Sequence, residues 1–254
     1  MNLLFLGDVV GQSGCDYFLS NLPKLKQKYK VDVCVANGEN SAEGNGILPS
    51  SATQLFDSGV DVITTGNHVF RRHEIYDMLE ENIGIVRPLN MHSTAPGVGY
   101  YIFDKLKYKV CVISLMGRIY MEALDNPFDA IDNLLPTIDT PIIIVDFHAE
   151  ATSEKISMAY HLDSRVSAVI GTHTHVQTAD ERIFAGGTGY ITDAGMCGSM
   201  DSVLGIKPEL ALKKLRTGLP VRFETAKENY KLHGVLLEID TASGKTTKIS
   251  RIAY

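Results

Sequence analysis

Short apolar runs alternate with polar segments of helical spacing along the first part of the chain. The runs Leu3 to Leu6, Val31 to Ala36 and Val60 to Thr64 have the length and composition of buried strands. Between them, Gly14 to Lys30 carries apolar residues at helical spacing, and the pair Pro49-Ser50 opens a second helix. This alternation predicts an α/β protein whose strands pair in parallel.

The pattern continues less regularly toward the C-terminus. Further helices are expected over Glu74 to Glu81, Asp129 to Leu135, Thr152 to Leu162 with Thr152 as the N-cap, and Pro208 to Arg216. Further strands are expected over Gly99 to Phe103, Lys109 to Leu115, Pro141 to Phe147, Val166 to Ile170, Arg182 to Phe184, Tyr190 to Thr192, Val221 to Thr225, His233 to Asp240 and Thr246 to Ile252. The middle pair and the tail are expected to be antiparallel, which gives two packed mixed sheets with helices outside.

The composition indicates one domain over residues 1–254. The chain has 254 residues with 44% hydrophobic content and shows neither a linker nor an internal repeat. Its net charge of -6 argues against long nucleic acids as partners, but one local positive site can still hold a small phosphorylated ligand.

The N-terminal apolar run has no basic residues before it and meets Asp8 early, so it is expected to be a strand and not a signal peptide. No run is long enough to cross a membrane. Cys34 and Cys111 lie in apolar runs and are expected to be reduced core residues, which fits a cytoplasmic protein.

Polar residues follow most of the predicted strands at the point where each strand ends. Ligands of α/β sheets bind at the carboxyl ends of the strands, so these side chains are expected to lie together. For Asp8, Glu39 and Asn40, and also for Asn67 and His68, a simple role in turns is an open alternative. The residues in question are Asp8, Glu39, Asn40, Asn67, His68, His148, His173 and His175.

The segment Gly171-Thr172-His173-Thr174-His175 places two imidazoles two residues apart. In an extended backbone both rings face the same side and can reach one point, as a metal site requires. The alternative is a polar loop with solvated histidines. Together with the strand-end residues, the histidines form a set of oxygen and nitrogen donors without sulfur, enough for two metals that share a carboxylate.

Five blocks of these residues resemble the metal-binding blocks of the calcineurin-like metallophosphoesterases. They are Gly7-Asp8, Gly38-Glu39-Asn40, Gly66-Asn67-His68, His148 and Gly171-Thr172-His173-Thr174-His175. Val10 stands where the superfamily usually has a histidine, and Glu39 where it usually has an aspartate. Both departures, together with Thr192 to Gly198 and Leu219 to Phe223, resemble the YmdB-like branch over essentially the whole chain.

This resemblance implies a four-layer α/β/β/α sandwich with two metals at the carboxyl ends of its strands, bridged by Glu39. It also implies that His68 binds no metal and protonates the leaving group, while a bridging hydroxide attacks the phosphate in line. One metal would bind Asp8, Asn40 and His175, and the other Asn67, His148 and His173. Because Val10 stands in place of the usual histidine of the block that begins Gly7-Asp8, the site is rich in oxygen donors. Such a site is expected to suit Fe or Mn at least as well as Zn.

The activity implied is hydrolysis of small phosphodiesters, with 2′,3′-cyclic nucleotides such as 2′,3′-cAMP as the expected substrates. A phosphomonoesterase of the same fold is one alternative. A regulatory protein that binds a nucleotide or RNA fragment around structural metals is another, although His68 favours catalysis because a binding module needs no general acid. The sequence leaves a homo-oligomer open.

Overall fold

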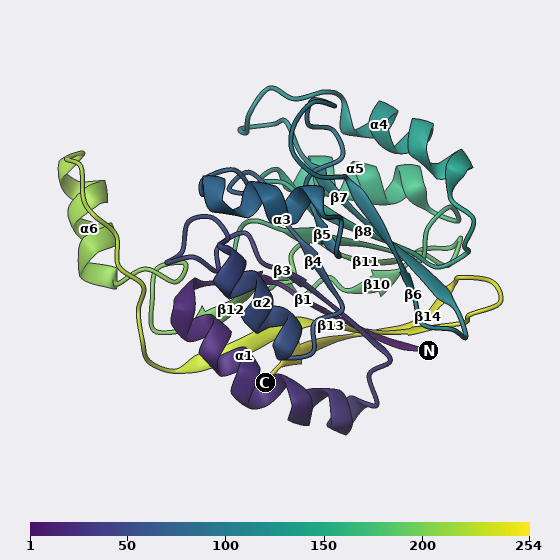
Figure 1. Cartoon of the computed structure of the whole chain (residues 1–254), viewed down its shortest axis with the longest axis horizontal. Coiled ribbons are helices and arrows are strands. Elements are labelled where there is room, and N and C mark those ends of the chain that lie inside the picture. Colours follow the sequence, from purple (N-terminus) through teal and green to yellow (C-terminus); the bar gives the residue numbers. More distant parts are fainter.

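Two β-sheets pack face to face, and helices cover their outer faces (Figure 1). The computed structural model describes all residues, 1–254. The strands of the first sheet are β1 (Asn2–Leu6), β2 (Asp8–Val9), β3 (Val33–Asn37), β4 (Val62–Thr64), β5 (Ile85–Val86), β12 (Met196–Ser199), β13 (Tyr230–Ile239) and β14 (Thr246–Ala253). Their order is β2-β12-β13-β1-β3-β4-β5, with β14 beside β13.

The second sheet has the order β10-β11-β9-β8-β7-β6. Its strands are β6 (Tyr100–Asp104), β7 (Lys109–Met116), β8 (Ile143–His148), β9 (Ala168–Thr172), β10 (Arg182–Ile183) and β11 (Gly189–Ile191). Strands β7, β8 and β9 run parallel, as do β1, β3 and β4 in the first sheet. The predicted parallel pairing is therefore confirmed, and so is the antiparallel pair β6 and β7.

Two helical layers enclose the sheets. The helices and helical turns on the first sheet are α1 (Gly11–Tyr29), α2 (Pro49–Asp57), η1 (His73–Ile75) and α3 (Tyr76–Glu80). Those on the second sheet are α4 (Pro127–Leu134), η2 (Leu135–Thr137) and α5 (Thr152–Leu162). A sixth helix, α6 (Pro208–Thr217), stands apart from both layers (Figure 1). None of the helices has the length and apolar content needed to cross a bilayer.

Strand alternation divides the apolar residues between the layers. In β1, Leu3 and Phe5 face the second sheet and pack with Ile144 and Ile170, whereas Leu4 and Leu6 face the helices. Each such side chain contributes about 1.5–3 kcal/mol when it is fully buried. The four-layer α/β/β/α arrangement follows from this alternation, and the predicted fold class is confirmed.

Two local predictions are wrong. Residues 221–225 form no strand, because this segment lies away from the sheets and only Thr225 makes an isolated bridge, to Ile206. Thr152 does not cap α5, because Ala151 has the extended backbone of the N-cap position and Thr152 already lies in the first turn. The strands β2, β5 and β12 were not predicted, since two to four residues carry too little pattern.

Candidate metal centre

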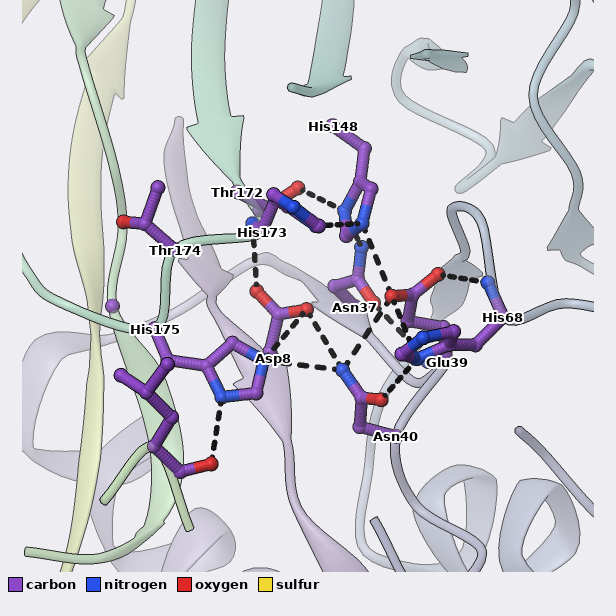
Figure 2. Close-up of polar contacts among 12 residues, drawn as sticks. Asp8, Asn37, Glu39, Asn40, His68, His148, Thr172, His173, Thr174 and His175 are labelled. Atoms are coloured by element: carbon purple, nitrogen blue, oxygen red, sulfur yellow. Dashed lines mark hydrogen bonds and ion pairs between the residues drawn. The ribbon is translucent and has the colours of Figure 1, made fainter. Parts of the chain in front are cut away.

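All eight candidate residues lie together at the carboxyl edge of the parallel strands, and all of them except Asn67 are labelled in Figure 2. Asp8 follows β1, and His148 is the last residue of β8. The remaining six follow β3, β4 and β9: Glu39, Asn40, Asn67, His68, His173 and His175. The strand ends therefore converge as expected, while the roles of these residues as ligands stay predictions.

A first donor cluster consists of Asn67, His148 and His173. Nε2 of His148 lies 2.9 Å from Oδ1 of Asn67 and 3.0 Å from Nδ1 of His173. Oε1 of Glu39 is 3.0 Å from the same Nε2 atom. The donor atoms of Glu39, His148 and His173 all lie within 4.8 Å of one another, which is close enough to ligate one ion.

A second donor cluster consists of Asp8, Asn40 and His175. Nε2 of His175 lies 3.2 Å from Nδ2 of Asn40 and 3.7 Å from Oδ1 of Asp8. The amide nitrogen of Asn40 therefore faces the other two residues, and its oxygen faces His68. A ligand role for that oxygen requires the amide to rotate, because an amide nitrogen has no lone pair to offer a cation.

Glu39 lies between the two clusters and is fully buried. Its Oε1 atom contacts His148 and accepts from Asn40 at 3.5 Å, so one carboxyl group faces both clusters. Burial alone would raise the pKa of this carboxyl. The charge of His148 and its hydrogen bond, together with His68, lower the pKa to about 2, so Glu39 is a carboxylate at neutral pH.

His68 lies beside both clusters, and its Nδ1 atom is 2.7 Å from Oδ1 of Asn40. Since an amide oxygen only accepts, Nδ1 carries a hydrogen. The backbone N–H of His68 donates to Oε2 of Glu39 at 3.0 Å. Burial lowers the pKa of His68, while the neighbouring carboxylate of Glu39 opposes that shift.

The two histidines of the first cluster have opposite pKa shifts. Burial favours the neutral form of His148, but the carboxylate of Glu39 and its hydrogen bond raise the pKa to about 9. Burial lowers the pKa of His173 to about 3, and the charge on His148 adds to that shift. Without a bound metal, these shifts favour a protonated His148 beside Glu39 and a neutral His173, and the neutral imidazole is the form that binds metals.

The extended backbone expected at His173 and His175 is not found. Strand β9 ends at Thr172, and both histidines have left-handed backbones, with φ of 101° for His173 and 65° for His175. The chain therefore turns at each of them, and their rings enter different clusters (Figure 2). Residues other than glycine adopt the left-handed backbone conformation at a cost of about 1–3 kcal/mol each, so surrounding contacts must stabilise this conformation.

A buried ion pair provides such contacts and was not predicted. Nζ of Lys155 donates to the backbone oxygen of Thr172 at 2.7 Å and to Oδ2 of Asp193 at 2.9 Å. The same carboxylate oxygen accepts from the backbone N–H of Thr174 at 3.0 Å and from its hydroxyl at 2.8 Å. The residue between the two histidines is therefore tied to an ion pair that is fully buried. Asp193 lies in the segment Thr192 to Gly198, which is part of the family resemblance, whereas nothing in the sequence indicated a structural role for Lys155.

The second ring nitrogen of each loop histidine also has a partner. Nε2 of His173 lies 3.2 Å from the carboxylate of Glu150. Nδ1 of His175 lies 3.1 Å from the backbone oxygen of Leu204. Such contacts fix the tautomer and orientation of ligand histidines. Neither partner was predicted: the acceptor at Leu204 is a backbone atom, which carries no sequence signal, and Glu150 was not among the candidate residues.

The ring of His148 is held by a polar network between the two sheets. Its Nδ1 atom lies 2.9 Å from the hydroxyl of Thr172, which donates to Asp146 at 2.6 Å. Asp146 also accepts from Asn37 and Thr64. Burial raises the pKa of Asp146 to about 6. Asp146, at the polar end of this apolar strand, therefore positions the ring of His148 through Thr172.

Gly66 makes room for the same ring. A Cβ atom built on this residue would lie 2.2 Å from Cδ2 of His148 and 2.5 Å from its Nε2. Any side chain here would displace the imidazole, so the glycine before Asn67 is a requirement of the site.

Comparison with known proteins identifies the chain. A family model described as YmdB-like protein matches residues 4–252. The chain belongs to this family. The predicted resemblance to the YmdB-like branch is thereby confirmed.

Family members of known name or structure match over nearly their full length. The 2′,3′-cyclic-nucleotide 2′-phosphodiesterase of Bacillus subtilis (strain 168) is 45% identical over 254 residues, which is 99% of this chain and 96% of that protein. A solved structure of a hypothetical protein from Thermus thermophilus has a TM-score of 0.95 at 38% identity and covers 100% of this chain and 99% of the other. A phosphatase from Mycoplasma pneumoniae has a TM-score of 0.93 at 36% identity, with 100% and 93% coverage.

Proposed function

We propose that this YmdB-like chain is a metal-dependent phosphodiesterase that hydrolyses small phosphodiesters, with 2′,3′-cyclic nucleotides such as 2′,3′-cAMP as substrates. The observation that carries the proposal is the pair of donor clusters that share Glu39, with His68 beside them. The named activity of the Bacillus subtilis relative supports the substrate class.

The donor set supports two transition metals. It offers carboxylate and amide oxygens and imidazole nitrogens, and the four cysteines lie elsewhere as buried free thiols. In the proposal the first donor cluster holds one metal, the second holds the other, and Glu39 touches both. Fe or Mn fits this oxygen-rich set at least as well as Zn. When bound, such metals supply an activated water and neutralise charge on the phosphate.

His68 is the proposed general acid. Its Nδ1 atom is engaged by Asn40, which leaves Nε2 to donate a proton to the leaving oxygen. Burial disfavours the protonated ring, but Glu39 favours it, and an anionic phosphate beside the ring adds to that effect. The side chain of Asn40 contacts Nδ1 of His68 through its oxygen in this structure, and would do so through its nitrogen after the rotation that a metal-ligand role requires, so in both cases Asn40 sets the orientation in which His68 meets the substrate.

Three further points belong to the proposal. The chain acts as a single domain over residues 1–254. Its partners are small phosphodiesters or nucleotides and not long nucleic acids, which the net charge of -6 supports. It works in the cytoplasm, which the four buried and unpaired cysteines support.

The decisive experiment compares His68→Ala with wild type on 2′,3′-cAMP and on a matched phosphomonoester, after the metal content of both proteins has been measured. The metals should remain and kcat for the diester should fall by about 10²- to 10⁴-fold, the usual worth of a general acid. His92→Ala, at a histidine whose side chain is bonded only to Thr94, is the matched control and should leave kcat unchanged.

Three results would contradict the proposal. An unchanged kcat in His68→Ala would remove its role as the acid. A preference for the monoester would favour a phosphomonoesterase. No hydrolysis of either substrate with both metals bound would favour a regulatory protein that binds nucleotides.

A further inference from the structure

Two consecutive arginines follow the turn that carries His68. Arg72 is half-buried, and its Nε atom donates to the backbone oxygen of Asn45 at 3.2 Å. Arg71 is exposed, and its guanidinium makes no hydrogen bond or ion pair with any other residue of the chain. Glu74, the nearest acid along the chain, contacts its own histidine neighbour at 3.3 Å. The fold therefore uses one arginine of the pair and leaves the other available to an anion.

The backbone fixes the position of Arg71 relative to His68. The N–H of Arg71 donates to the backbone oxygen of His68 at 3.0 Å, so the two residues stand at the two ends of one turn. Val69 between them is fully buried in the hydrophobic core, and Phe70 packs edge-on against Tyr76 with ring centroids 5.4 Å apart. Groups on such an anchored segment hold a ligand more precisely than groups on a loose loop.

The loop after β3 packs against the same two arginines. Gly46 in this loop has a left-handed backbone, and a Cβ atom built on it would lie 2.8 Å from Cγ of Arg72 and 3.1 Å from Cβ of Arg71. The loop that follows Glu39 and the turn that carries His68 therefore meet at this point. Arg71 lies at the junction of two segments that both supply residues to the candidate metal centre.

The centre is open to solvent beside His68 (Figure 2). The side chain of His68 is 28% exposed, whereas those of Glu39 and His148 are 1% and 0% exposed. Burial lowers the pKa of His68, and the positive charge of Arg71 adds to that shift, so the guanidinium lies within electrostatic range of the imidazole. Arg71 thus carries an unpaired positive charge at the open side of the centre.

The proposed reaction determines which part of a substrate meets this charge. His68 protonates the leaving oxygen, so the leaving group lies on the side of His68, while the phosphate under attack lies at the donor clusters. Arginine binds phosphate oxygens through parallel N–H bonds and is the usual residue for such recognition. In a nucleoside 2′,3′-cyclic phosphate the leaving group is the nucleoside itself, and its 5′ oxygen can carry a second phosphate.

We propose that Arg71 binds a second phosphate of the substrate, carried on the 5′ oxygen of the nucleoside whose 2′,3′-cyclic phosphate is hydrolysed. This phosphate belongs either to a 5′-phosphorylated mononucleotide or to the 3′ end of a short oligonucleotide. A nucleoside without it leaves the guanidinium in water and is the weaker substrate. The inference rests on the proposed function, because it names the substrate class of the same centre.

Binding to the metal-loaded protein tests the proposal without turnover. Calorimetry compares 3′-AMP with adenosine 3′,5′-bisphosphate, which differ only in the 5′ phosphate. Wild type should bind the bisphosphate about 10-fold more tightly, the usual contribution of a hydrogen bond to a charged group, and Arg71→Gln should bind both alike. Arg71→Lys keeps the charge without the paired N–H groups and should retain part of the difference. Arg216→Gln, at an exposed arginine of α6, is the matched control and should retain all of it.

Equal affinity of wild type for the two nucleotides, or an undiminished difference in Arg71→Gln, would overturn the proposal. If no substrate is hydrolysed although the bisphosphate still binds more tightly through Arg71, the proposed activity is wrong and the second phosphate site stands.

Hydrolysis identifies the source of the phosphate. Adenosine 5′-phosphate 2′,3′-cyclic phosphate and a diadenosine dinucleotide with a 2′,3′-cyclic end are each compared with 2′,3′-cAMP. The preferred one should have a KM about 10-fold below that of 2′,3′-cAMP, and Arg71→Gln should remove this advantage with kcat unchanged. A fall of kcat in Arg71→Gln that is equal for all three substrates would show that Arg71 acts on His68 and would contradict the proposal.

Discussion

Lys155 and Asp193 form an ion pair at 2.9 Å, with their side chains 1% and 0% exposed, directly behind the loop that carries His173 and His175. Neither residue is one of the eight candidate residues of the metal centre. Their bonds go instead to Thr172 and Thr174, which flank His173 on both sides. The pair therefore holds the left-handed backbone of the loop and so sets the direction of both imidazoles.

The substitution Lys155→Met should destabilise the protein by about 3–5 kcal/mol, because it leaves the carboxylate of Asp193 buried without a counter-charge. Urea unfolding of the metal-free protein measures the effect. Lys248 pairs with Glu238 on the surface, and Lys248→Met should change stability by less than about 1 kcal/mol. Equal effects of the two substitutions would show that the buried pair does not hold the loop.

The hydroxyl of Thr174 should control how firmly the centre holds metal. Thr174→Val keeps the shape of the side chain but loses the bond to Asp193, so a chelator should remove metal at about 10- to 100-fold lower concentration. Thr174→Ser retains the hydroxyl and should restore the wild-type value. Thr137→Val, at a distant exposed threonine, serves as the control. Equal metal retention in the valine and serine variants would contradict this prediction.

Gly66→Ala should displace the ring of His148 and reduce the metal content of the purified protein. The added Cβ would lie 2.2 Å from the imidazole, and Gly66 has no left-handed backbone that would complicate the comparison. Gly218→Ala adds a Cβ with no atom within 4 Å, and although the left-handed backbone of Gly218, with φ of 70°, strains the alanine, the strain falls at the C-cap of α6 and should leave the metal content unchanged. Elemental analysis of both variants decides the point, and full metal occupancy in Gly66→Ala would show that the ring can move without loss of the site.

The stability of the metal-free protein should fall as the pH rises from about 6.5 to about 9. The pKa of His148 is raised to about 9 by the carboxylate of Glu39, so the stabilisation from its proton is complete below its ordinary value of 6.5 and is lost above the raised one. Melting temperatures across this range, with a chelator present, measure the trend. In the variant His148→Gln, the fall of stability with pH should be smaller, because the contribution of the His148 proton is gone. A wild-type stability that rises with pH over this range would contradict a positively charged His148.

The residues at the strand ends were predictable because the apolar runs before them were clear. Asp8 and His148 each end a run whose pattern indicates a buried strand, and parallel strands bring their ends to one edge. The backbone of His173 and His175 was not predictable, since the left-handed conformation depends on Asp193, which is distant in sequence.

Other features depend on contacts between distant segments and left little local signal. Lys155 lies on a helix where a lysine is usually solvated, and only the fold shows that it is buried. Residues 221–225 have the alternation of a strand, yet they lie in the long connection between β12 and β13, where no neighbouring strand is present to pair with them. In both cases tertiary position overrides what the local residues favour.

The backbone oxygen of Leu204 connects a surface segment of the chain to the candidate metal centre. It lies in the long connection between β12 and β13, residues 200–229, and it is also the acceptor that orients His175. A displacement of this connection would therefore reach an imidazole of the centre through a single hydrogen bond. The position of a surface segment and the geometry of the donor clusters would then be mechanically coupled, since both depend on the direction of the same ring.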